Sequence, residues 1–519
     1  MFITILLFIL ILFLTCHYYA QYISNQRLMN KIPGYVSYVI VNNLILGQDS
    51  LEELWKILIN LADLYYPILK LWNFLVFLIF IRHPNDLEVM LKNSKHIEKG
   101  IFYDALHPFI GTSLFTSTRS KWQSRRRLLT PIFHFNALQQ FTEILIEEGE
   151  SMTNSLKNAG DTITKDLDPF ISEHTLNAIC EAVIGISPQG MSLFQHQYRK
   201  AVYRINEFIV YRFFRQWAHN NWIFSLTPKG REQTKILKLL HGFTEKIIEE
   251  RKVYHKHNGQ YLRNLIEGTV ATDAKTIEIQ KKRLAMLDFL IIASQKDLLT
   301  DSDIKEEVNG LIYKSHDTVA MGICFALSLL AEHKDIQDCA RKEIDTIMQQ
   351  NQGKLTMKSL QDLQYLERCI QETLRLYPSV LLMARITSED TQLRYTFIKY
   401  FSESHLIPAG AMMILNIFKV HRDKNFWPNP EIFDPDRFLP ENVQNRHLYS
   451  YIPFSAGPRK CIGQRFALLM MKAMIAPLIH NFYLEPVDYL KDVRMGINLI
   501  CRPLDSHRIK FIPIATKSI

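Results

Sequence analysis

The first twenty residues, MFITILLFILILFLTCHYYA, form a nearly uninterrupted apolar run in which Phe2–Cys16 carries no charge. About 20 apolar residues let a helix cross a bilayer, so residues 1–20 predict a retained membrane anchor. Arg27 and Lys31 follow this run, and the positive-inside rule then places the rest of the chain in the cytosol. A cleaved signal peptide is the alternative, although neither a basic leading region nor a small-residue cleavage site is clear.

The pattern of a globular body begins after a linker, residues 21–34, which ends in a Pro33-Gly34 turn. The run Phe74–Ile81 is too short to span a membrane and predicts a buried strand. Elsewhere apolar positions mostly recur at helical spacing, as in Phe141–Lys157 and Ala285–Ser294. The polar stretch Lys256–Asp273 contains two glycines and predicts a long surface loop. The pattern therefore predicts a mainly α fold with a minor β lobe.

Composition removes several classes of protein. With 47% hydrophobic residues in 519, the chain can bury enough apolar surface to fold, so extensive disorder is excluded. Seven cysteines are too few, and odd in number, for a disulfide scaffold. The net charge of +9 favours acidic partners or anionic membranes, but no dense basic tract indicates nucleic-acid binding. Length alone suggests about three domains. The aromatic and Arg-rich stretch Phe208–Phe224 suits either a second membrane contact or ordinary helix packing.

A single cysteine lies in the glycine-rich segment Phe454–Gly463, FSAGPRKCIG, directly before an apolar stretch of helical spacing. Cys461 would then sit at a helix N-terminus, where the dipole and free N–H groups stabilise a thiolate. Arg459 and Lys460 add positive charge beside it. Because no neighbouring Cys or His completes a zinc site, one thiolate on a metal cofactor is the sharper interpretation, and an inert buried cysteine is the alternative.

Two further patterns are informative. Glu372 and Arg375 lie three residues apart on a predicted helix that ends at Pro378, so they can pair. A surface ion pair of little energetic weight is the alternative. Trp122 and Arg126 lie one helical turn apart and can both reach a carboxylate, although plain packing explains such a pair equally well.

A long helix is predicted over Ile304–Glu332, and its middle carries the polar residues 315–318 (Ser-His-Asp-Thr) before an almost wholly apolar half. Ser and Thr can bond back to the carbonyl four residues earlier and bend a helix. A helix cap at Ser315 and a satisfied buried polar cluster are the structural alternatives.

The segment Phe454–Gly463 resembles the haem-ligand loop of cytochromes P-450, F-x-x-G-x-R-x-C-x-G, at every fixed position. The resemblance implies that Cys461 is the axial thiolate of haem b and that Phe454 packs beneath the ligand loop. It also implies that propionates bind Trp122, Arg126, Arg385 and Arg459, and that Gly463 completes the loop. Arg437, in a later P-x-R-F sequence, would join Glu372 and Arg375 in a buried network that fixes the loop.

Asp317 and Thr318 map onto the acid–alcohol pair that delivers protons to iron-bound dioxygen in this family. Two residues depart from its pattern, since Lys314 and Ser315 replace a small or acidic residue and a glycine. The fatty-acid ω-hydroxylase branch, family four, often has a Glu at the Lys314 position that is esterified to haem. Lysine cannot form that ester, so covalently attached haem is not expected. Ser315 adds bulk where dioxygen and substrate would lie.

The matching motifs run in order from Trp122 to Gly463, and they imply a single haem-thiolate catalytic domain over residues 35–519 in place of three domains. The resemblance implies a microsomal monooxygenase of the endoplasmic reticulum membrane, with a cytosolic catalytic domain and no nucleic-acid partner. It would insert one oxygen atom of O2 into a fatty acid, hydrocarbon, hormone or xenobiotic. Electrons would come from NADPH through cytochrome P-450 reductase, with cytochrome b5 as a further partner.

Two surfaces of this enzyme can be assigned by position. The reductase would dock on a basic patch formed by Arg125, Arg127, Lys460, Arg465 and Lys472. The substrate pocket would be lined by His107–Ser117, Phe208–Phe214, Gly310–Ser315, Ser379–Met383 and Met495–Ile500. A haem-thiolate isomerase or dehydratase that needs no reductase, and a non-catalytic anchored helical protein, stay open as alternatives.

Overall fold

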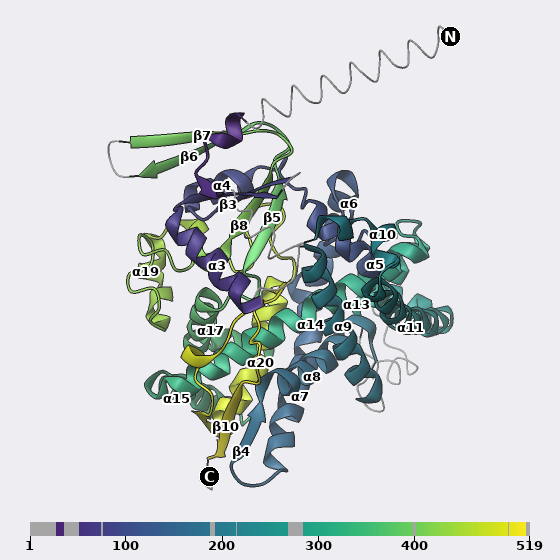
Figure 1. The fold of residues 1–519 in the computed structure, drawn as a ribbon. Coiled ribbons are helices and arrows are strands. Elements are labelled where there is room, and N and C mark those ends of the chain that lie inside the picture. The colour runs from purple at the N-terminus through teal and green to yellow at the C-terminus, as the bar shows by residue number, and fades with distance from the viewer. Residues whose placement is uncertain are drawn as a thin grey trace.

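The computed structural model describes residues 27–35, 51–73, 76–186, 192–213, 215–267, 284–397, 401–496 and 498–514. A small lobe of sheet packs beside a larger body of helices (Figure 1). The ten strands are β1 (Gly34–Tyr35), β2 (Ile68–Asn73), β3 (Val76–Ile81), β4 (Ile163–Asp166), β5 (Leu382–Ile386), β6 (Thr391–Phe397), β7 (Phe401–Ile407), β8 (Met412–Asn416), β9 (Phe482–Pro486) and β10 (Arg508–Pro513) among the described residues. The expectation of a mainly helical fold with a minor β part is therefore confirmed.

The helices follow the chain with few long interruptions in the described ranges. They are α3 (Leu51–Leu64), α4 (Pro84–Lys92), α5 (His107–Ile110), α6 (Arg119–Leu129), α7 (Phe135–Lys157), α8 (Leu167–Ile179), α9 (Ser192–Phe213), α10 (Asn221–Ser225), α11 (Pro228–Glu267), α13 (Met286–Gln295), α14 (Asp301–Glu332), α15 (Lys334–Gln350), α16 (Met357–Asp362), α17 (Gln364–Leu376), α18 (Ile417–Val420), α19 (Pro440–Gln444) and α20 (Gln464–Asn481). Short 3-10 turns join several of them, including η5 (Pro435–Phe438).

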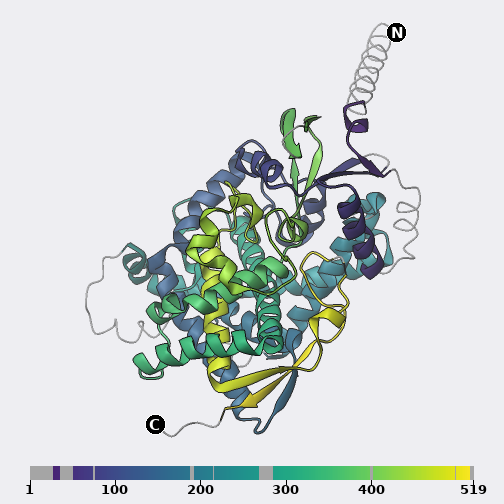
Figure 2. The ribbon, with the colours of Figure 1, turned by 90° about the vertical axis from the view of Figure 1, so that its left-hand side faces the viewer.

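The main sheet has the strand order β1-β2-β3-β8-β5. At its centre β3 runs parallel to β8, with Ile79 opposite Met413. Both faces are apolar there, because the sequences of β3 (VFLIFI) and β8 (MMILN) are almost wholly apolar. Such continuous apolar strands require cover on both faces. The predicted strand over Phe74–Ile81 is confirmed for Val76–Ile81. A three-stranded sheet, β4-β10-β9, lies at the opposite end of the molecule (Figure 2). The hairpin β6-β7 forms a third sheet beside the main one, and its Leu393 and Ile407 share an apolar cluster with Ile79 of β3.

The helical core is organised around α14, which packs against α8, α17 and α20. This helix is continuous through the polar residues 315–318, so Ser315 does not start a new helix. It begins at Asp301, three residues before the predicted start, because Thr300 and Asp303 form a reciprocal capping box. On α7, Gly149 lies so close to α20 that an added Cβ would be 2.2 Å from the Ala473 carbonyl oxygen. The backbones of α7 and α20 are thus in close contact at this point.

Two sequence predictions need correction or restriction. The surface loop predicted over Lys256–Asp273 is wrong for its first part, because α11 continues as a helix through Glu267, and residues 268–273 lie outside the described residues. A run of polar residues is compatible with a solvated helix as well as with a loop. The predicted anchor, residues 1–20, lies outside the described residues. Among the residues that are described, no helix combines the length and apolarity that crossing a membrane requires. In the linker, Met29 and Ile32 are buried against the β lobe.

Candidate functional site

The cysteine loop is closed by a backbone hydrogen bond in which Cys461 N–H donates to the Phe454 carbonyl at 2.8 Å. Ser455 and Gly457 both adopt positive φ, at 61° and 70°, which folds the chain back on itself. Gly463 is the N-cap residue of α20, two positions after Cys461. The prediction that Cys461 lies at a helix N-terminus is therefore confirmed.

Cys461 keeps an exposed surface, yet the surrounding protein partly removes water from its thiol. This burial raises the pKa of the thiol, while the Gly463 N–H and the charges of Arg126 and Lys99 act in the opposite direction. The local dipole and cations thus oppose the cost of a buried thiolate without overcoming it. A metal cation bound to the sulfur would supply the missing stabilisation.

Several basic side chains lie near Cys461. Arg385 is buried, and Arg459 lies with its guanidinium 4.8 Å from the centroid of the Trp122 ring. Burial, and next the neighbouring Arg385, lower the pKa of Arg459 to about 9. The pKa of Lys99 is lowered well below its usual range by burial and then by Arg459, Arg385 and Lys314. Arg126 donates to the Lys460 carbonyl at 2.9 Å, which joins α6 to the cysteine loop.

These cations are the test of whether a haem fits here. No ion pair to Lys99, Arg385 or Arg459 is found within the described ranges. The Arg459 guanidinium donates to the backbone carbonyls of Leu114, Phe115 and Ser117, and its Nε is buried without a hydrogen-bond partner there. Mutually repelling cations of this kind need an anion between them. Haem carries two propionate carboxylates on one edge and takes a thiolate as an axial iron ligand. The cations and the Cys461 thiol are therefore a donor set that fits the group.

The Glu372–Arg375 pair is fully buried and bidentate. Arg375 Nε and Nη2 each donate to Glu372 at 2.7 Å. Arg437 Nε lies 3.3 Å from Glu372 Oε1, and the Asp434 N–H donates to the same oxygen at 3.1 Å. The predicted three-residue cluster is thus assembled, and it is not a surface ion pair.

His421 links this cluster to the cysteine loop. The Ile452 N–H donates to His421 Nε2 at 2.8 Å, so Nδ1 carries the proton and donates to the Arg375 carbonyl at 3.2 Å. Burial, and next the charge of Arg375, lower the pKa of His421 to about 3, which keeps the ring neutral. Ile452 precedes Phe454 by two residues, so the position of Arg375 is transmitted to the start of the loop.

The polar residues of α14 face different surroundings. Thr318 Oγ1 donates back to the Lys314 carbonyl at 2.8 Å, as the sequence allowed, and the Thr318 carbonyl accepts from Ser379 Oγ at 2.7 Å. Asp317 is buried and forms an ion pair with Arg502, while Asn206 Nδ2 donates to it at 3.3 Å. Asp317 and Thr318 are therefore neighbours in sequence with separate hydrogen-bond partners.

Asp317 and Arg502 line a half-open cavity of ≈ 220 Å³ between α8, α9 and α14. Asp168 lies on the same wall, 3.4 Å from Arg502 Nε, and burial raises the pKa of its carboxyl. Burial alone would lower the pKa of Arg502, but the carboxylates of Asp317 and Asp168 raise it. The remaining lining residues are Pro169, Ser172, His196, Arg199, Lys200, Val202, Tyr203 and His316. This polar cavity has Asp317 on its wall.

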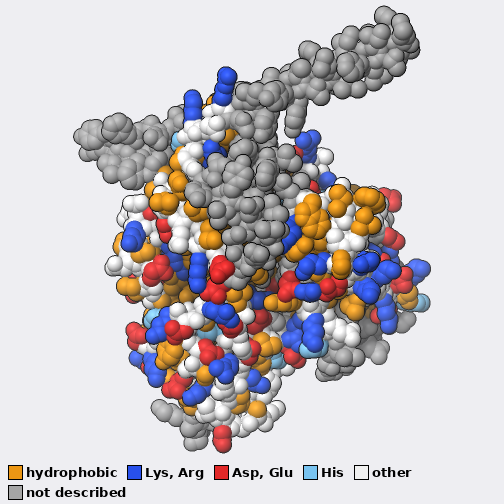
Figure 3. Space-filling view, in the orientation of Figure 1, with side chains coloured by type: hydrophobic (Ala, Val, Ile, Leu, Met, Phe, Trp, Pro, Cys, Tyr) orange, Lys and Arg blue, Asp and Glu red, His pale blue; other side chains and the backbone are white. Residues whose placement is uncertain are grey.

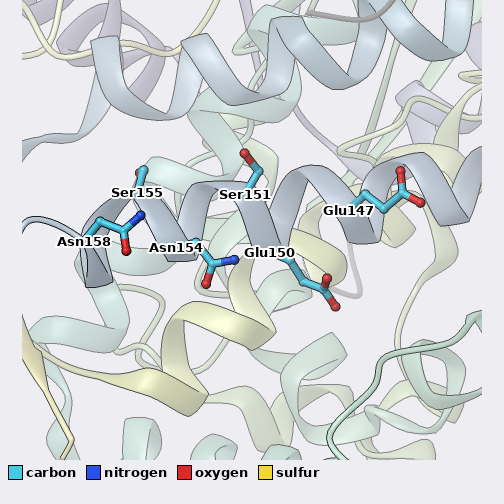
Figure 4. A pocket seen from close by; sticks show the side chains of 6 residues that line it. All are labelled: Glu147, Glu150, Ser151, Asn154, Ser155 and Asn158. Carbon is cyan, nitrogen blue, oxygen red and sulfur yellow. The ribbon is translucent and has the colours of Figure 1, made fainter. Parts of the chain in front are cut away.

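A second hollow is shallow and lies over the exposed side of α7. It is lined by Glu147, Glu150, Ser151, Asn154, Ser155 and Asn158 (Figure 4). All six come from one helix and its C-cap. We assign this hollow no role.

The predicted basic docking patch is wrong for two of its members. Lys472 is 3% exposed, and its ammonium donates to the Leu360 carbonyl and pairs with Glu367. Arg125 is also buried and pairs with Asp303 and Glu307 on α14. These cations have partners that are distant in sequence, which their charge alone cannot reveal. Arg127, Lys460 and Arg465 are exposed.

Two residues of the site were missed in the sequence. Lys99 has no motif around it, and its place beside Arg385 and Arg459 follows only from the packing of the β lobe against the helices. Arg502 lies near the C-terminus, 185 residues from its partner Asp317. A buried carboxylate such as that of Asp317 requires a cationic partner. The sequence therefore indicates that such a partner exists, but it does not indicate which residue it is.

Comparison with known proteins agrees with this geometry. The family model described as Cytochrome P450 matches residues 33–505. The chain is 36% identical over 497 residues to "Cytochrome P450 4c3" of Drosophila melanogaster, which covers 94% of this chain and 90% of that protein. It is 33% identical over 496 residues to "Cytochrome P450 4V2" of Homo sapiens, with 95% and 91% covered. Given the family model and these family-four relatives, the chain belongs to the cytochrome P450 family and is a monooxygenase.

Proposed function

We propose that this cytochrome P450 is a membrane-bound haem-thiolate monooxygenase in which Cys461 is the axial iron ligand. The observation that carries the assignment is the accessible Cys461 thiol in a loop fixed by Phe454 and Gly463, beside cations that lack an anion. Arg385, Arg459 and Trp122 would hold the propionates, with Arg126 anchoring the loop itself. Because Lys314 stands at the branch's esterified position, the haem is held without a covalent link.

The bound haem supplies the activation of dioxygen that the protein's own side chains cannot perform. The chain contributes orientation, exclusion of water and protons. Thr318 presents a hydroxyl whose proton is held by the Lys314 carbonyl, and Asp317 stands beside it with access to the polar cavity. Asp317, which lies on the wall of the cavity, and Thr318, which presents a hydroxyl, are the proposed proton-supplying residues, and water would connect them because their own hydrogen bonds go to different partners.

Electrons would reach the iron from NADPH through an acidic flavoprotein reductase, with cytochrome b5 as a second donor. Arg127, Lys460 and Arg465 are exposed cations. Lys460 and Arg465 lie in or just after the cysteine loop, and Arg127 follows Arg126, which donates to the Lys460 carbonyl. A basic surface of this kind speeds the encounter with an acidic partner. We therefore restrict the docking patch to these three residues.

The endoplasmic reticulum membrane is the proposed location, with residues 1–20 as the anchor. A second contact is supported by side chains around α10. Trp217, Trp222, Ile223 and Leu226 are between 40% and 71% exposed, and hydrophobic side chains gather there beside Lys and Arg (Figure 3). Exposed tryptophan flanked by cations suits a lipid interface.

The substrate is proposed to be lipophilic, because most residues of the segments assigned to the pocket wall are apolar and some of these segments contact each other. An added Cβ on Gly310 would meet Ser113 Oγ at 2.9 Å, which joins two of the segments. Ser379 contacts the Thr318 carbonyl, and its own carbonyl accepts from Cys501 N–H at 2.9 Å. Fatty acids, hydrocarbons, hormones and xenobiotics are all compatible with such a wall.

The test is the spectrum of the reduced carbon-monoxide complex. We expect a red-shifted Soret band for the wild type and its loss in Cys461→Ser, because a serine hydroxyl is a much weaker donor to iron. Arg459→Gln should retain the band with weaker haem retention. A band that survives in Cys461→Ser would overturn the assignment. Oxygen uptake that depends on NADPH and reductase separates a monooxygenase from an isomerase or dehydratase, and colourless protein would indicate a non-catalytic role.

A further inference from the structure

Ser379 is a polar side chain that the mechanism proposed above does not use. It lies just after α17 and Pro378, in the segment that leads to β5. Its hydroxyl donates to the Thr318 carbonyl of α14 at 2.7 Å, although the two residues are 61 positions apart in the chain. The hydrogen bond therefore joins two separate elements at the residue that is proposed to supply protons.

The contact between α14 and the end of α17 follows one face of α14. The Tyr377 ring stacks on the Phe325 ring, with the centroids 4.5 Å apart and 7° between the planes. At Gly322 an added Cβ would lie 3.6 Å from Leu374 Cδ2, so the two elements approach closely there. Thr318, Gly322 and Phe325 recur at the spacing of one helix face. Apolar packing serves at the last two positions, whereas at Thr318 the contact is a hydrogen bond.

Ser379 is itself fixed from two sides. The Cys501 N–H donates to its carbonyl at 2.9 Å, and the next residue, Arg502, pairs with Asp317. On the other side, Arg375 of the buried cluster lies four residues before Ser379. The segment that holds Ser379 in place therefore also holds the second proton-supplying residue.

Thr318 is consequently fixed at two points. Its hydroxyl donates to the Lys314 carbonyl at 2.8 Å, and its own carbonyl accepts from Ser379. A carbonyl oxygen has two lone pairs, so it can accept from a side chain as well as from the helix. Hydroxyls that bond to helix carbonyls alter the local course of the helix. Without the Ser379 hydroxyl, the orientation of Thr318 depends on the Lys314 carbonyl and on the helix itself.

We propose that Ser379 is a positioning residue for Thr318, and that its hydrogen bond keeps the Thr318 hydroxyl where protons are supplied to dioxygen. The inference rests on the proposed proton-supplying role of Thr318. Ser379 acts through Thr318 and delivers no proton itself. When proton supply fails, one NADPH and one proton reduce one O2 to one hydrogen peroxide, because the O–O bond stays intact.

The first measurement is the hydrogen peroxide released per NADPH consumed by full-length holoenzyme with reductase and with dodecanol as the lipophile. We expect Ser379→Ala to raise this ratio by about twofold or more, because a small misplacement of a reacting group is enough to slow its step. Ser379→Thr keeps a hydroxyl and should restore the wild-type ratio. In a Thr318→Ala background, Ser379→Ala should cause no further rise, because the two residues act as one unit.

The second measurement needs no turnover. Amide hydrogen exchange of residues 315–322 in the resting holoenzyme should become about threefold or more faster in Ser379→Ala, and Ser379→Thr should match the wild type. Ser328→Ala is the matched control, because Ser328 is buried on the same helix and its hydroxyl donates to the Cys324 carbonyl at 2.8 Å. It removes a hydrogen bond of the same kind and should leave the peroxide ratio unchanged. All these variants should keep the reduced carbon-monoxide band.

Each other outcome contradicts the proposal. Unchanged exchange in Ser379→Ala would show that the hydroxyl does not hold this turn of α14. Faster exchange with an unchanged peroxide ratio would leave Ser379 a structural role only. An equal rise in Ser328→Ala would indicate general loosening of the helix, and a further rise in the double variant would indicate an effect that bypasses Thr318. A wild type without the reduced carbon-monoxide band would instead overturn the haem-thiolate assignment, while hydrogen exchange would still report on the Ser379 contact, so the two failures are distinguishable.

Discussion

Replacing Glu372 with glutamine should destabilise the protein by about 3 kcal/mol or more, because it leaves a buried guanidinium without its counter-charge. Neither Glu372 nor Arg375 is exposed, and two hydrogen bonds of 2.7 Å join them. Each charge-assisted bond of this kind is worth roughly 1.5 to 3 kcal/mol. Glutamine keeps one neutral acceptor, while the carbonyls of His421 and Ile432, which also accept from Arg375, cannot neutralise its charge.

The measurement is urea unfolding of the holoenzyme followed by circular dichroism, with the free-energy change taken from the midpoint and slope. Glu250→Gln is the matched control, because Glu250 is 61% exposed and its oxygen lies 4.0 Å from Lys246 Nζ. Exposed helix pairs of this type contribute less than about 0.5 kcal/mol. Equal midpoints for the two variants would refute the reasoning. Haem content should fall in Glu372→Gln only, since the network reaches the cysteine loop through His421.

Three further outcomes are expected. Burial raises the pKa of Glu307 from 4.5 to about 7, so its folded carboxyl stays protonated where the unfolded one ionises. The free energy of unfolding contributed by this group is therefore lost as pH rises from about 4.5 to 7, by at most roughly 3 kcal/mol. The melting temperature of Glu307→Gln, measured relative to that of the wild type, should rise between about pH 5 and 8. A difference that does not change with pH contradicts this. Arg502→Met leaves the buried Asp317 carboxylate without its cationic partner, so it should lower the free energy of unfolding in urea by about 3 kcal/mol or more, and unchanged stability would argue against the ion pair. Thr318→Ala should keep the reduced carbon-monoxide band but divert electrons to hydrogen peroxide, and full coupling would remove the proton-transfer role.

Sequence patterns predicted the elements that depend on local spacing. The helix through residues 315–318 and the strand at Val76–Ile81 follow from periodicity and from runs of apolar residues, and both are present. The Glu372–Arg375 pair could be foreseen because its two residues lie one turn apart on the same helix. Local rules therefore sufficed wherever the partners are close in sequence.

Features that depend on distant partners could not be read in this way. Lys472 looks like a surface cation until Leu360 and Glu367 are placed beside it. α11 stays helical past Lys256, where the polar composition had predicted a loop. Hydrophilic residues suit a solvated helix as well as a loop, so composition alone could not decide between them. Lys99 joins the site only because the β lobe packs against the helices. The charge of a residue was visible, but whether that charge would face water was not.

The cysteine loop and the β lobe share a boundary that matters for protein engineering. Gly457 has a positive φ, and a Cβ placed there would lie 1.8 Å from the Leu91 carbonyl oxygen on α4. A surface against which the loop bends thus belongs to a helix more than 360 positions earlier in the sequence. A designer who grafts only Phe454–Gly463 onto another scaffold would carry over the ligand but not the surface that bends it. Grafting the end of α4 together with the loop would keep both the cysteine ligand and the contact at Gly457.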